Sequence, residues 1–370
     1  MRYYIIAGEA SGDLHGSNLI QQLHLSDNHA NVRCWGGDLM QSAGATLVKH
    51  YRDLAFMGFA EVLINLRTIL KNIAFCKNDI LSYKPDILIL IDYPGFNIRI
   101  AEWAKKQGIK TVYYISPQIW AWKENRVHTI KKYVDKMIVI LPFEKNFYSK
   151  WDYKVEYVGH PLIEVIEHFK ATHPKPAASE KIIALLPGSR KQEINIKLPV
   201  MLEVSKAFPE YKFAVAKAPG LEDAFYEPFL EKYKNVSALA GKTYDVLNQA
   251  TAALVTSGTA TLEAALFGVP EVVCYKGNLI SYQIAKWVIK VKYISLVNLI
   301  MDKLVVKELI QDEMTAENCI KELKDLLENA AGKEQLQKDY TNLRSLLSQG
   351  GNASANAAKI IYEFVKGVAG

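Results

Sequence analysis

The chain has 370 residues, of which 50% are hydrophobic and 23% charged, and its formal net charge is +6. These values exclude a disordered chain, and the length favours two domains over one. The charge is modest for nucleic-acid binding, so no nucleic-acid partner is expected, but it suits phosphorylated substrates or an anionic membrane surface.

The chain gives no sign of secretion. Its four cysteines are scattered without a CxxC pair, which is typical of reduced thiols in a cytoplasmic protein. The apolar run near the N-terminus is too short for a signal peptide, and no run of eighteen apolar residues could span a bilayer. We therefore expect a cytoplasmic protein.

The first half of the chain predicts strands that alternate with helices. The first strand runs into a loop with Gly8, Gly12 and Gly16, which is typical of a phosphate or sugar site but is not the GxGxxG dinucleotide fingerprint. Helices are expected over His15–Leu25 and Gly37–Ala43. The expected strands are Tyr3–Ala7, Val32–Gly36, Pro85–Ile91, Thr111–Ile115, Lys136–Leu141 and Glu156–Val158.

Asp92 follows the unbroken apolar strand Pro85–Ile91. Ligands of open α/β sheets bind at the carboxyl ends of strands. A carboxylate shielded there by Tyr93 and Phe96 could have its pKa tuned for general-base work. The alternative is a structural cap for the following helix.

The segment Leu54–Leu70 is unusually apolar. A buried helix is the commoner outcome for such a run, and the alternative is an exposed helix that touches a membrane or grips an acyl chain. The loop Ser116–Trp122 is rich in aromatic residues, and the basic run Arg126–Lys132 follows it. Lys286–Tyr293 could add to the same membrane surface.

The proline-containing segment His168–Lys181 is the best candidate for a linker. After it the pattern of strands begins again, so we expect domains over residues 1–170 and 180–350, with a last helix in 351–370 that crosses back to the first domain. The expected strands are Ile182–Leu186, Tyr211–Ala216, Val236–Leu239, Ala252–Val255 and a strand that ends at Tyr275. Two successive Rossmann-like α/β domains facing across a cleft describe the B-type glycosyltransferase architecture.

The stretch Ala252–Tyr275 reads as strand, polar turn, helix, turn and strand. Ser257, Gly258 and Thr259 stand where the helix must begin, and its free N–H groups could bind a diphosphate. Glu263 lies one turn further on, where a carboxylate could accept from two ribose hydroxyls. The alternative is a plain capped helix in a parallel sheet.

The chain resembles the lipid-A-disaccharide synthases, which are bacterial inverting glycosyltransferases. A series of motifs carries the resemblance in order along most of the chain: Ala7–Asp13, Met57–Leu63, Ile91–Asn97, Ser116–Trp122, Leu141–Lys145, Val158–Pro161, Leu186–Arg190 and Ser257–Glu263. The chain departs from the family at Gly95, where a second aspartate is usual, and at Val297, where proline is usual. The base must therefore be Asp92 or lie elsewhere.

The resemblance implies transfer of a diacylated glucosamine from UDP to the 6-hydroxyl of a diacylated glucosamine 1-phosphate, lipid X, with inversion. It gives Asp92 the role of base, with His15 as its rival, and it gives Arg190 the departing diphosphate. The implied substrate-binding residues are Glu9, Ser11, Gly188, Ser189, Ser257, Gly258, Thr259, Glu263, Tyr275 and Asn298. No metal or other cofactor is needed in this scheme, and the sequence has no Asp-x-Asp site.

Acylated substrates imply a peripheral enzyme on the cytoplasmic face of an anionic inner membrane. Whether it acts as a monomer or a homodimer stays open. Two other classes remain: another B-type enzyme, such as a UDP-sugar epimerase or a transferase for polyprenyl-linked sugars, and a non-catalytic nucleotide-sugar or lipid-binding protein. A requirement for acyl chains and for Asp92 separates the three.

Overall fold

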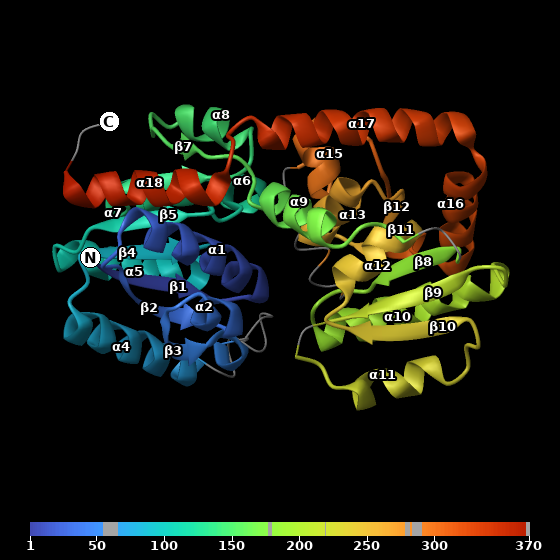
Figure 1. Ribbon diagram of the computed structural model, residues 1–370, viewed down its shortest axis with the longest axis horizontal. Helices are drawn as coiled ribbons and strands as arrows, with labels where there is room; N and C mark the ends of the chain where they lie inside the picture. The colour runs from blue at the N-terminus through green and yellow to red at the C-terminus, as the bar shows by residue number, and fades with distance from the viewer. Residues whose placement is uncertain (55–65, 177–179, 219, 278–281, 283–290, 368–370) are drawn as a thin grey trace. The chain divides into compact units, whose positions relative to one another are not determined.

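The computed structural model describes residues 1–54, 66–176, 180–218, 220–277, 282 and 291–367 (Figure 1). Most of the expected membrane helix Leu54–Leu70, the motif Met57–Leu63 and most of Lys286–Tyr293 lie outside these residues. The chain forms two compact units. Unit 1 comprises Met1–Pro161 and Ser348–Gly370, and unit 2 comprises Leu162–Leu347.

Unit 1 is built on a parallel sheet of seven strands in the order β3-β2-β1-β4-β5-β6-β7. The long apolar runs of the sequence form the centre of this sheet. Strand β4 is buried along its whole length, because the two faces of a parallel sheet are covered by helices. The strands are β1 (Arg2–Ala7), β2 (Asn31–Gly36), β3 (Thr46–His50), β4 (Ile87–Ile91), β5 (Thr111–Tyr114), β6 (Lys136–Val139) and β7 (Glu156–Tyr157).

The helices of unit 1 follow its strands in turn. They are α1 (Ala10–Ser26), α2 (Asp38–Ser42), α4 (Leu66–Tyr83), α5 (Pro94–Lys106), α6 (Ile119–Trp122), α7 (Arg126–Tyr133) and α8 (Glu144–Ser149), with the 3-10 turn η1 (Tyr51–Leu54). The last helix, α18 (Ala353–Lys366), packs along α1, so the C-terminal segment completes the unit that the N-terminus begins (Figure 1).

Unit 2 repeats the arrangement with six parallel strands in the order β10-β9-β8-β11-β12-β13. The strands are β8 (Ile182–Leu186), β9 (Lys212–Lys217), β10 (Val236–Ala240), β11 (Ala250–Thr256), β12 (Glu271–Tyr275) and β13 (Lys307–Ile310). Its helices are α9 (Leu162–Thr172), α10 (Lys191–Val204), α11 (Asp223–Leu230), α12 (Thr243–Gln249), α13 (Thr259–Phe267), α15 (Leu296–Met301), α16 (Ala316–Glu328) and α17 (Ala330–Ser348), with the 3-10 turns η2 (Ser205–Ala207) and η3 (Gln311–Glu313).

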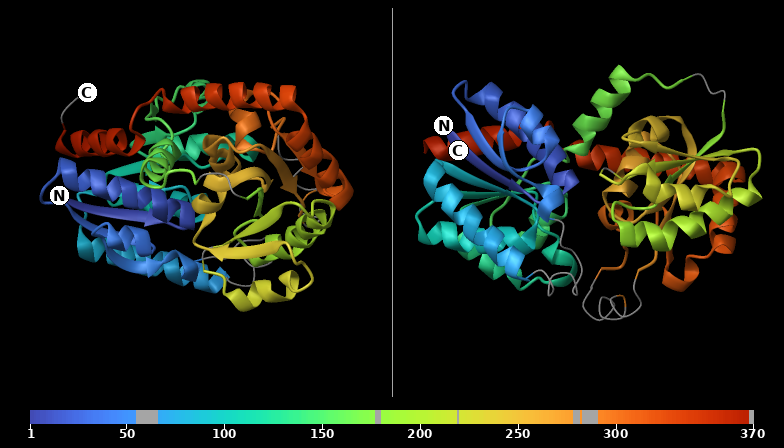
Figure 2. Two further views of the ribbon diagram at one scale, coloured as in Figure 1. Left: turned by 45° about the vertical axis from the view of Figure 1, so that its right-hand side comes forward. Right: turned by 90° about the horizontal axis from the view of Figure 1, so that it is seen from below.

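Alternate residues of β8 enter two different cores. Ile183 and Leu185 pack with residues of α10 and α16, whereas Ala184 and Leu186 pack with residues of α12 and α13. Because successive side chains of a strand point to opposite faces, the sheet must be covered by helices on both sides. Figure 2 shows helices on both faces of each sheet.

Both units therefore have the strand order of a Rossmann-like sheet, in which the chain starts at the centre and reverses direction there. The expected α/β class with two Rossmann-like sheets is confirmed. The prediction that the linker begins at His168 is wrong, because α9 continues to Thr172. Lys170 of this helix is fixed within unit 2, where its Nζ donates to the carbonyl of Leu266 at 2.7 Å. Edge strand β3 was not expected, since its residues are only partly buried.

Candidate functional site

Asp92 lies at the carboxyl end of the central strand β4, between that strand and helix α5. Asp92 and Tyr93 both have left-handed backbone angles, with φ of 42° and 49°. Such angles are strained for residues other than glycine and recur at functional sites. The turn is held by its neighbours, because the Asp92 carbonyl accepts from Asn97 Nδ2 at 2.8 Å and from the Tyr113 hydroxyl.

Glu9 lies at the same edge of the sheet, because β1 and β4 are paired with Ala7 opposite Ile91. Burial and then the Glu9 charge raise the pKa of Asp92 to about 7. The Tyr93 ring covers Gly8 so closely that a Cβ on this glycine would lie 2.3 Å from the ring. Gly8 therefore lets an aromatic ring close over the start of this loop.

His15 and Ser11 lie on the first turns of α1. Ser11 is partly exposed, whereas His15 is buried and burial lowers its pKa to about 4. Among the described residues, His15 Nδ1 has no hydrogen-bond partner. A second buried histidine, His160, lies close enough for His15 to help lower its pKa to about 3. Both imidazoles are therefore neutral at pH 7.

The sequence did not single out Asp13 and Glu144 as structural supports of this edge. The buried Asp13 carboxylate accepts from the backbone N–H groups of Gly37, Leu39 and Met40, and so caps α2. Glu144 accepts from the N–H of Leu141 at 3.0 Å, and burial raises its pKa to about 7. No local pattern in the sequence signals the cap at Asp13, because this residue lies 24 positions before Gly37.

A second group of expected residues lies at the carboxyl edge of the sheet of unit 2. Strands β8 and β11 are paired with Leu186 opposite Val255, so the loops that follow them lie next to each other. The first loop carries Gly188, Ser189 and Arg190. Ser189 and Arg190 are exposed, and Arg190 Nη1 donates to Glu193 Oε1 at 3.0 Å.

Gly188 adopts a φ of +120°, and a Cβ there would lie 2.4 Å from Glu193 Oε2. The loop therefore needs glycine for two reasons, its left-handed backbone and the carboxylate packed beneath it. Lys197 Nζ lies 3.8 Å from the same carboxylate oxygen, and burial lowers the pKa of this lysine. Glu193 thus has a cation on each side.

Helix α13 begins at Thr259, directly after the carboxyl end of β11. Gly258 is its N-cap with a φ of 135°, and nothing lies within 4 Å of where a Cβ on this glycine would be. The Ser257 hydroxyl donates to the carbonyl of Ile294 at 2.7 Å. Gly258 provides no side-chain cap for the first N–H groups of α13, and such an uncapped helix start suits an anion.

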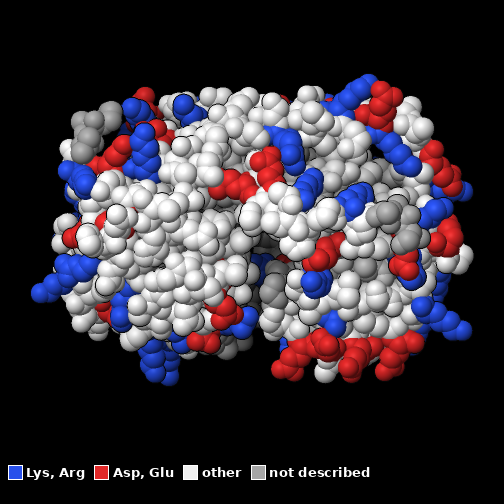
Figure 3. All heavy atoms as spheres, in the orientation of Figure 1, with Lys and Arg blue, Asp and Glu red and all other residues white. Residues whose placement is uncertain are grey.

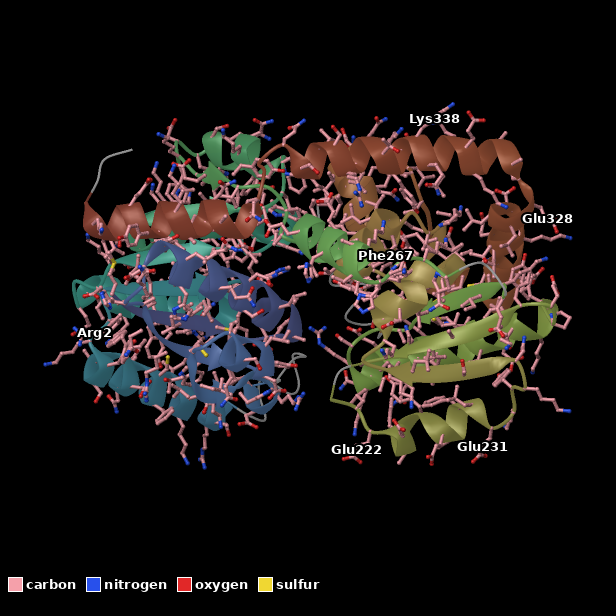
Figure 4. The ribbon with its side chains drawn as sticks, viewed as in Figure 1. Arg2, Glu222, Glu231, Phe267, Glu328 and Lys338 are labelled. Carbon is pink, nitrogen blue, oxygen red and sulfur yellow. The ribbon has the colours of Figure 1, made fainter. Side chains whose placement is uncertain are left out.

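Glu263 and Tyr275 belong to the same edge. Glu263 Oε1 accepts from the Tyr244 hydroxyl at 2.9 Å, and burial raises the pKa of this carboxyl group. Tyr275 ends β12, one residue past Cys274, which is paired with Thr256 of β11. Figure 4 labels Phe267 at the opposite end of α13 from Gly258.

Asn298 has no hydrogen-bonding capacity left for a ligand. Its side chain is fully buried in unit 2. Its Nδ2 donates to the carbonyl of Val306 and to Glu308, and its Oδ1 accepts from the N–H groups of Val305 and Val306. These four bonds use every position of the amide. The expected contact between Asn298 and the nucleotide or sugar is therefore replaced by a structural role.

No helix among the described residues is long and apolar enough to cross a membrane.

The chain resembles the solved structures of an epimerase and of a glycosyltransferase. The UDP-GlcNAc 2-epimerase from Neisseria meningitidis, bound to UDP-GlcNAc, is 15% identical with a TM-score of 0.66, over 99% of this chain and 100% of that one. CalG4, the calicheamicin glycosyltransferase, is 16% identical with a TM-score of 0.61, over 100% and 99% of the two chains. At these identities the likeness shows the fold, which is that of B-type glycosyltransferases.

Sequence comparison is more specific. The family model for lipid-A-disaccharide synthetase matches residues 3–362. The lipid-A-disaccharide synthase of Geobacter metallireducens is 39% identical over 98% of this chain and 97% of its own length. That of Psychromonas ingrahamii is 40% identical over 88% and 89% of the two chains. The chain belongs to the lipid-A-disaccharide synthases, the disaccharide-forming glycosyltransferases of lipid A biosynthesis.

Proposed function

We propose that the protein transfers 2,3-diacylglucosamine from its UDP donor to the 6-hydroxyl of 2,3-diacylglucosamine 1-phosphate, lipid X. The products are the β-1,6-linked disaccharide 1-phosphate and UDP, with inversion at the anomeric carbon. Membership of the family supports a lipid-sugar substrate. The two groups of residues at the carboxyl edges of the two sheets support the division into an acceptor side in unit 1 and a donor side in unit 2.

The position of Asp92 is the observation that carries this proposal. A base that removes the proton of the acceptor hydroxyl works best when its pKa lies near the working pH, and the pKa of Asp92 is about 7. His15 has a pKa of about 4, so its neutral imidazole is a weaker base. Glu9 and Ser11 then bind the acceptor sugar beside Asp92.

The reaction forms one bond and breaks one. The acceptor oxygen bonds to the anomeric carbon as its proton passes to Asp92, and the bond from that carbon to the diphosphate oxygen breaks. The negative charge that develops on UDP is stabilised by Arg190, by the loop at Gly188 and Ser189, and by the N–H groups of α13. Ser257, Gly258 and Thr259 hold the diphosphate, Glu263 binds the ribose, and Tyr275 borders the nucleotide.

We further propose that the protein works on the cytoplasmic face of an anionic inner membrane. Helix α4 of unit 1 exposes Leu70 and Phe75, at 53% and 50%, beside the exposed cations Arg67 and Lys71. Apolar insertion and charge attraction together suit such a surface. Figure 3 shows acidic side chains gathered along one edge of unit 2, over α11, where an anionic bilayer would be repelled.

The test is an assay with the purified protein, UDP-diacylglucosamine and lipid X in the presence of chelator. UDP release and disaccharide are followed by mass, for the parent protein and for Asp92→Asn and His15→Gln. We expect product that requires both lipids and that disappears in Asp92→Asn while donor binding remains. Product formation by Asp92→Asn at the parent rate would remove Asp92 as the base. Turnover of non-acylated UDP-N-acetylglucosamine without lipid X would point instead to an epimerase.

A further inference from the structure

Tyr244 is the hydrogen-bond partner of Glu263 within unit 2. Its hydroxyl donates to Glu263 Oε1 at 2.9 Å, from helix α12 to helix α13. A carboxylate can accept several hydrogen bonds on its two oxygens. The bond from Tyr244 therefore holds one oxygen of the carboxylate in place and leaves the second oxygen for other donors.

The Tyr244 ring is held by two phenylalanines. It lies edge-on to Phe169 of α9, with ring centroids 5.5 Å apart, and it lies 5.3 Å from Phe267 at the end of α13. Phe169 and Phe267 are themselves in edge contact at 5.8 Å. Rings packed on two sides have little freedom at χ1, so the direction of the hydroxyl is set by packing.

The helices that carry this cluster are tied together at the end of α13. Lys170 Nζ of α9 and Arg344 Nη2 of α17 both donate to the carbonyl of Leu266, at 2.7 Å and 3.2 Å. Cations at the C-terminus of a helix stabilise it through its dipole. Helix α13 is therefore anchored at its C-terminal end, while its N-terminal end stays open for an anion.

From this geometry we infer that Tyr244 is a positioning residue for the ribose of the nucleotide. It acts through Glu263, whose carboxylate it orients so that the remaining acceptor positions meet the two vicinal hydroxyls. This inference rests on the proposed role of Glu263. Nothing in it requires Tyr244 to touch the substrate.

The protonation states agree with this arrangement. Burial and the neighbouring Glu263 charge raise the pKa of Tyr244, so the phenol remains the donor. The hydrogen bond from Tyr244 opposes the effect of burial on the pKa of Glu263. Loss of the hydroxyl should therefore raise the pKa of Glu263 further. When the pH is lowered, UDP binding by Tyr244→Phe should then begin to weaken at a higher pH than UDP binding by the parent protein.

The experiment is calorimetric titration of the full chain with UDP and with 2′,3′-dideoxy-UDP, for Tyr244→Phe, Glu263→Gln and the double variant. Tyr244→Phe keeps the ring and removes only the hydroxyl. We expect each single variant to weaken UDP binding by about 10- to 150-fold, the range for one hydrogen bond to a charged group. Binding of the dideoxy nucleotide should change by less than about twofold. The double variant should lose no more affinity than Glu263→Gln alone.

Tyr233→Phe is the matched control, because the Tyr233 hydroxyl donates to Glu203 of α10, a pair of the same kind in the same unit. It should leave both affinities unchanged. Equal weakening of UDP and dideoxy-UDP by Tyr244→Phe would overturn the inference. If Glu263→Gln weakened the binding of UDP and of dideoxy-UDP equally, the proposed contact between Glu263 and the ribose would itself be overturned. A Tyr244→Phe protein with the parent affinity for UDP, beside a weakened Glu263→Gln, would overturn the positioning role alone.

Discussion

Gly350 packs backbone to backbone against Gly159, and a Cβ on Gly350 would lie 2.0 Å from the Gly159 nitrogen. Both residues belong to unit 1, Gly159 just before its first segment ends at Pro161 and Gly350 just after its second segment begins at Ser348. The contact thus holds the returning segment, with helix α18, onto the sheet of unit 1.

Gly350→Ala should therefore destabilise the protein. The added methyl group meets backbone, which cannot rotate away, so a cost of about 1–3 kcal/mol or more is expected. Thermal unfolding measures it. Gly95→Ala is the control, because nothing lies within 4 Å of a Cβ there and the residue lies in helix α5. This change should leave the melting temperature unchanged or slightly higher. Equal stability of the two variants would contradict the argument.

Asp92→Asn should lower activity and raise stability. The pKa of Asp92 is about 7 in the folded protein and 3.8 ordinarily, so the folded state holds its proton more tightly than the unfolded state. The stability from this proton is present below pH 4 and is lost as the pH rises through 7. Asparagine has no such loss, and above pH 7 the gain should be on the order of 1–4 kcal/mol.

Unfolding in denaturant at pH 4 and pH 8 checks this, since the variants should differ only at the higher pH. The same group should give the parent enzyme an acid limb with a pKa near 7 in kcat/KM. If the parent protein and Asp92→Asn were equally stable at pH 4 and also at pH 8, Asp92 would have to be solvated in the folded protein.

The strand before Asp92 could be foreseen from the sequence, whereas the backbone angles after it could not. An unbroken apolar run such as Ile87–Ile91 has few other places to lie than the middle of a covered sheet. The edge strand Thr46–His50 lacks this signal, because its residues are only partly buried and mix polar with apolar types. Strand β13 and helices α16 and α17 are likewise not among the elements expected from the sequence.

Site residues were foreseeable where local chain geometry fixes them. The turn at Gly258 and the helix after it follow from consecutive residues, so the open N-terminus of α13 was expected. Asn298 and Glu263 were different. The partners of Asn298 lie seven to ten residues further along the chain, and Tyr244 lies nineteen residues before Glu263. Only the packing of separate elements reveals whether such a polar group is already occupied.

Glu271→Gln should stabilise unit 2. Both carboxylate oxygens of Glu271 are buried and lack a hydrogen-bond partner among the described residues, and burial raises the pKa of this group well above its usual value. Glu271 therefore affects stability in the same direction as Asp92: the parent protein loses stability as the pH rises through the pKa of Glu271 in the folded state. The advantage of Gln should therefore grow with pH and vanish below pH 4, as thermal unfolding can show.

Glu308→Gln is the matched opposite. Glu308 is also buried, but its carboxylate accepts from the backbone N–H groups of Ile294 and Ser295 and from Asn298 Nδ2. The N–H of Ile294 is shared between the two oxygens, at 3.2 Å and 3.1 Å. In glutamine an NH2 group replaces one of these oxygens and would face this donor, at a cost of about 1–3 kcal/mol. A lower melting temperature for Glu271→Gln at neutral pH would contradict the account of Glu271, and an unchanged or higher one for Glu308→Gln would contradict the account of Glu308.

Arg190→Ala should slow the reaction without unfolding the protein. Its guanidinium is exposed and pairs with Glu193 three residues on, so little stability depends on it. A charged hydrogen bond to the departing diphosphate is worth about 1.5–3 kcal/mol, or about 10- to 150-fold in kcat/KM. Lys206→Ala removes a similar exposed pair with Glu203 at the other end of α10 and should leave kcat/KM unchanged. Equal rates for the two variants would exclude Arg190 from the mechanism.

Leu70→Glu should release the protein from anionic liposomes. Leu70 lies on α4 and is 53% exposed, so the change removes an apolar group from the proposed membrane surface and adds a repelled charge without disturbing the core. Leu304→Glu is the control, because Leu304 is 61% exposed in unit 2, outside the proposed surface. In flotation with vesicles that contain anionic lipid, the control should float with the parent protein while Leu70→Glu stays in the soluble fraction. If the two variants float equally, or if the parent does not float at all, α4 is not the surface that meets the membrane.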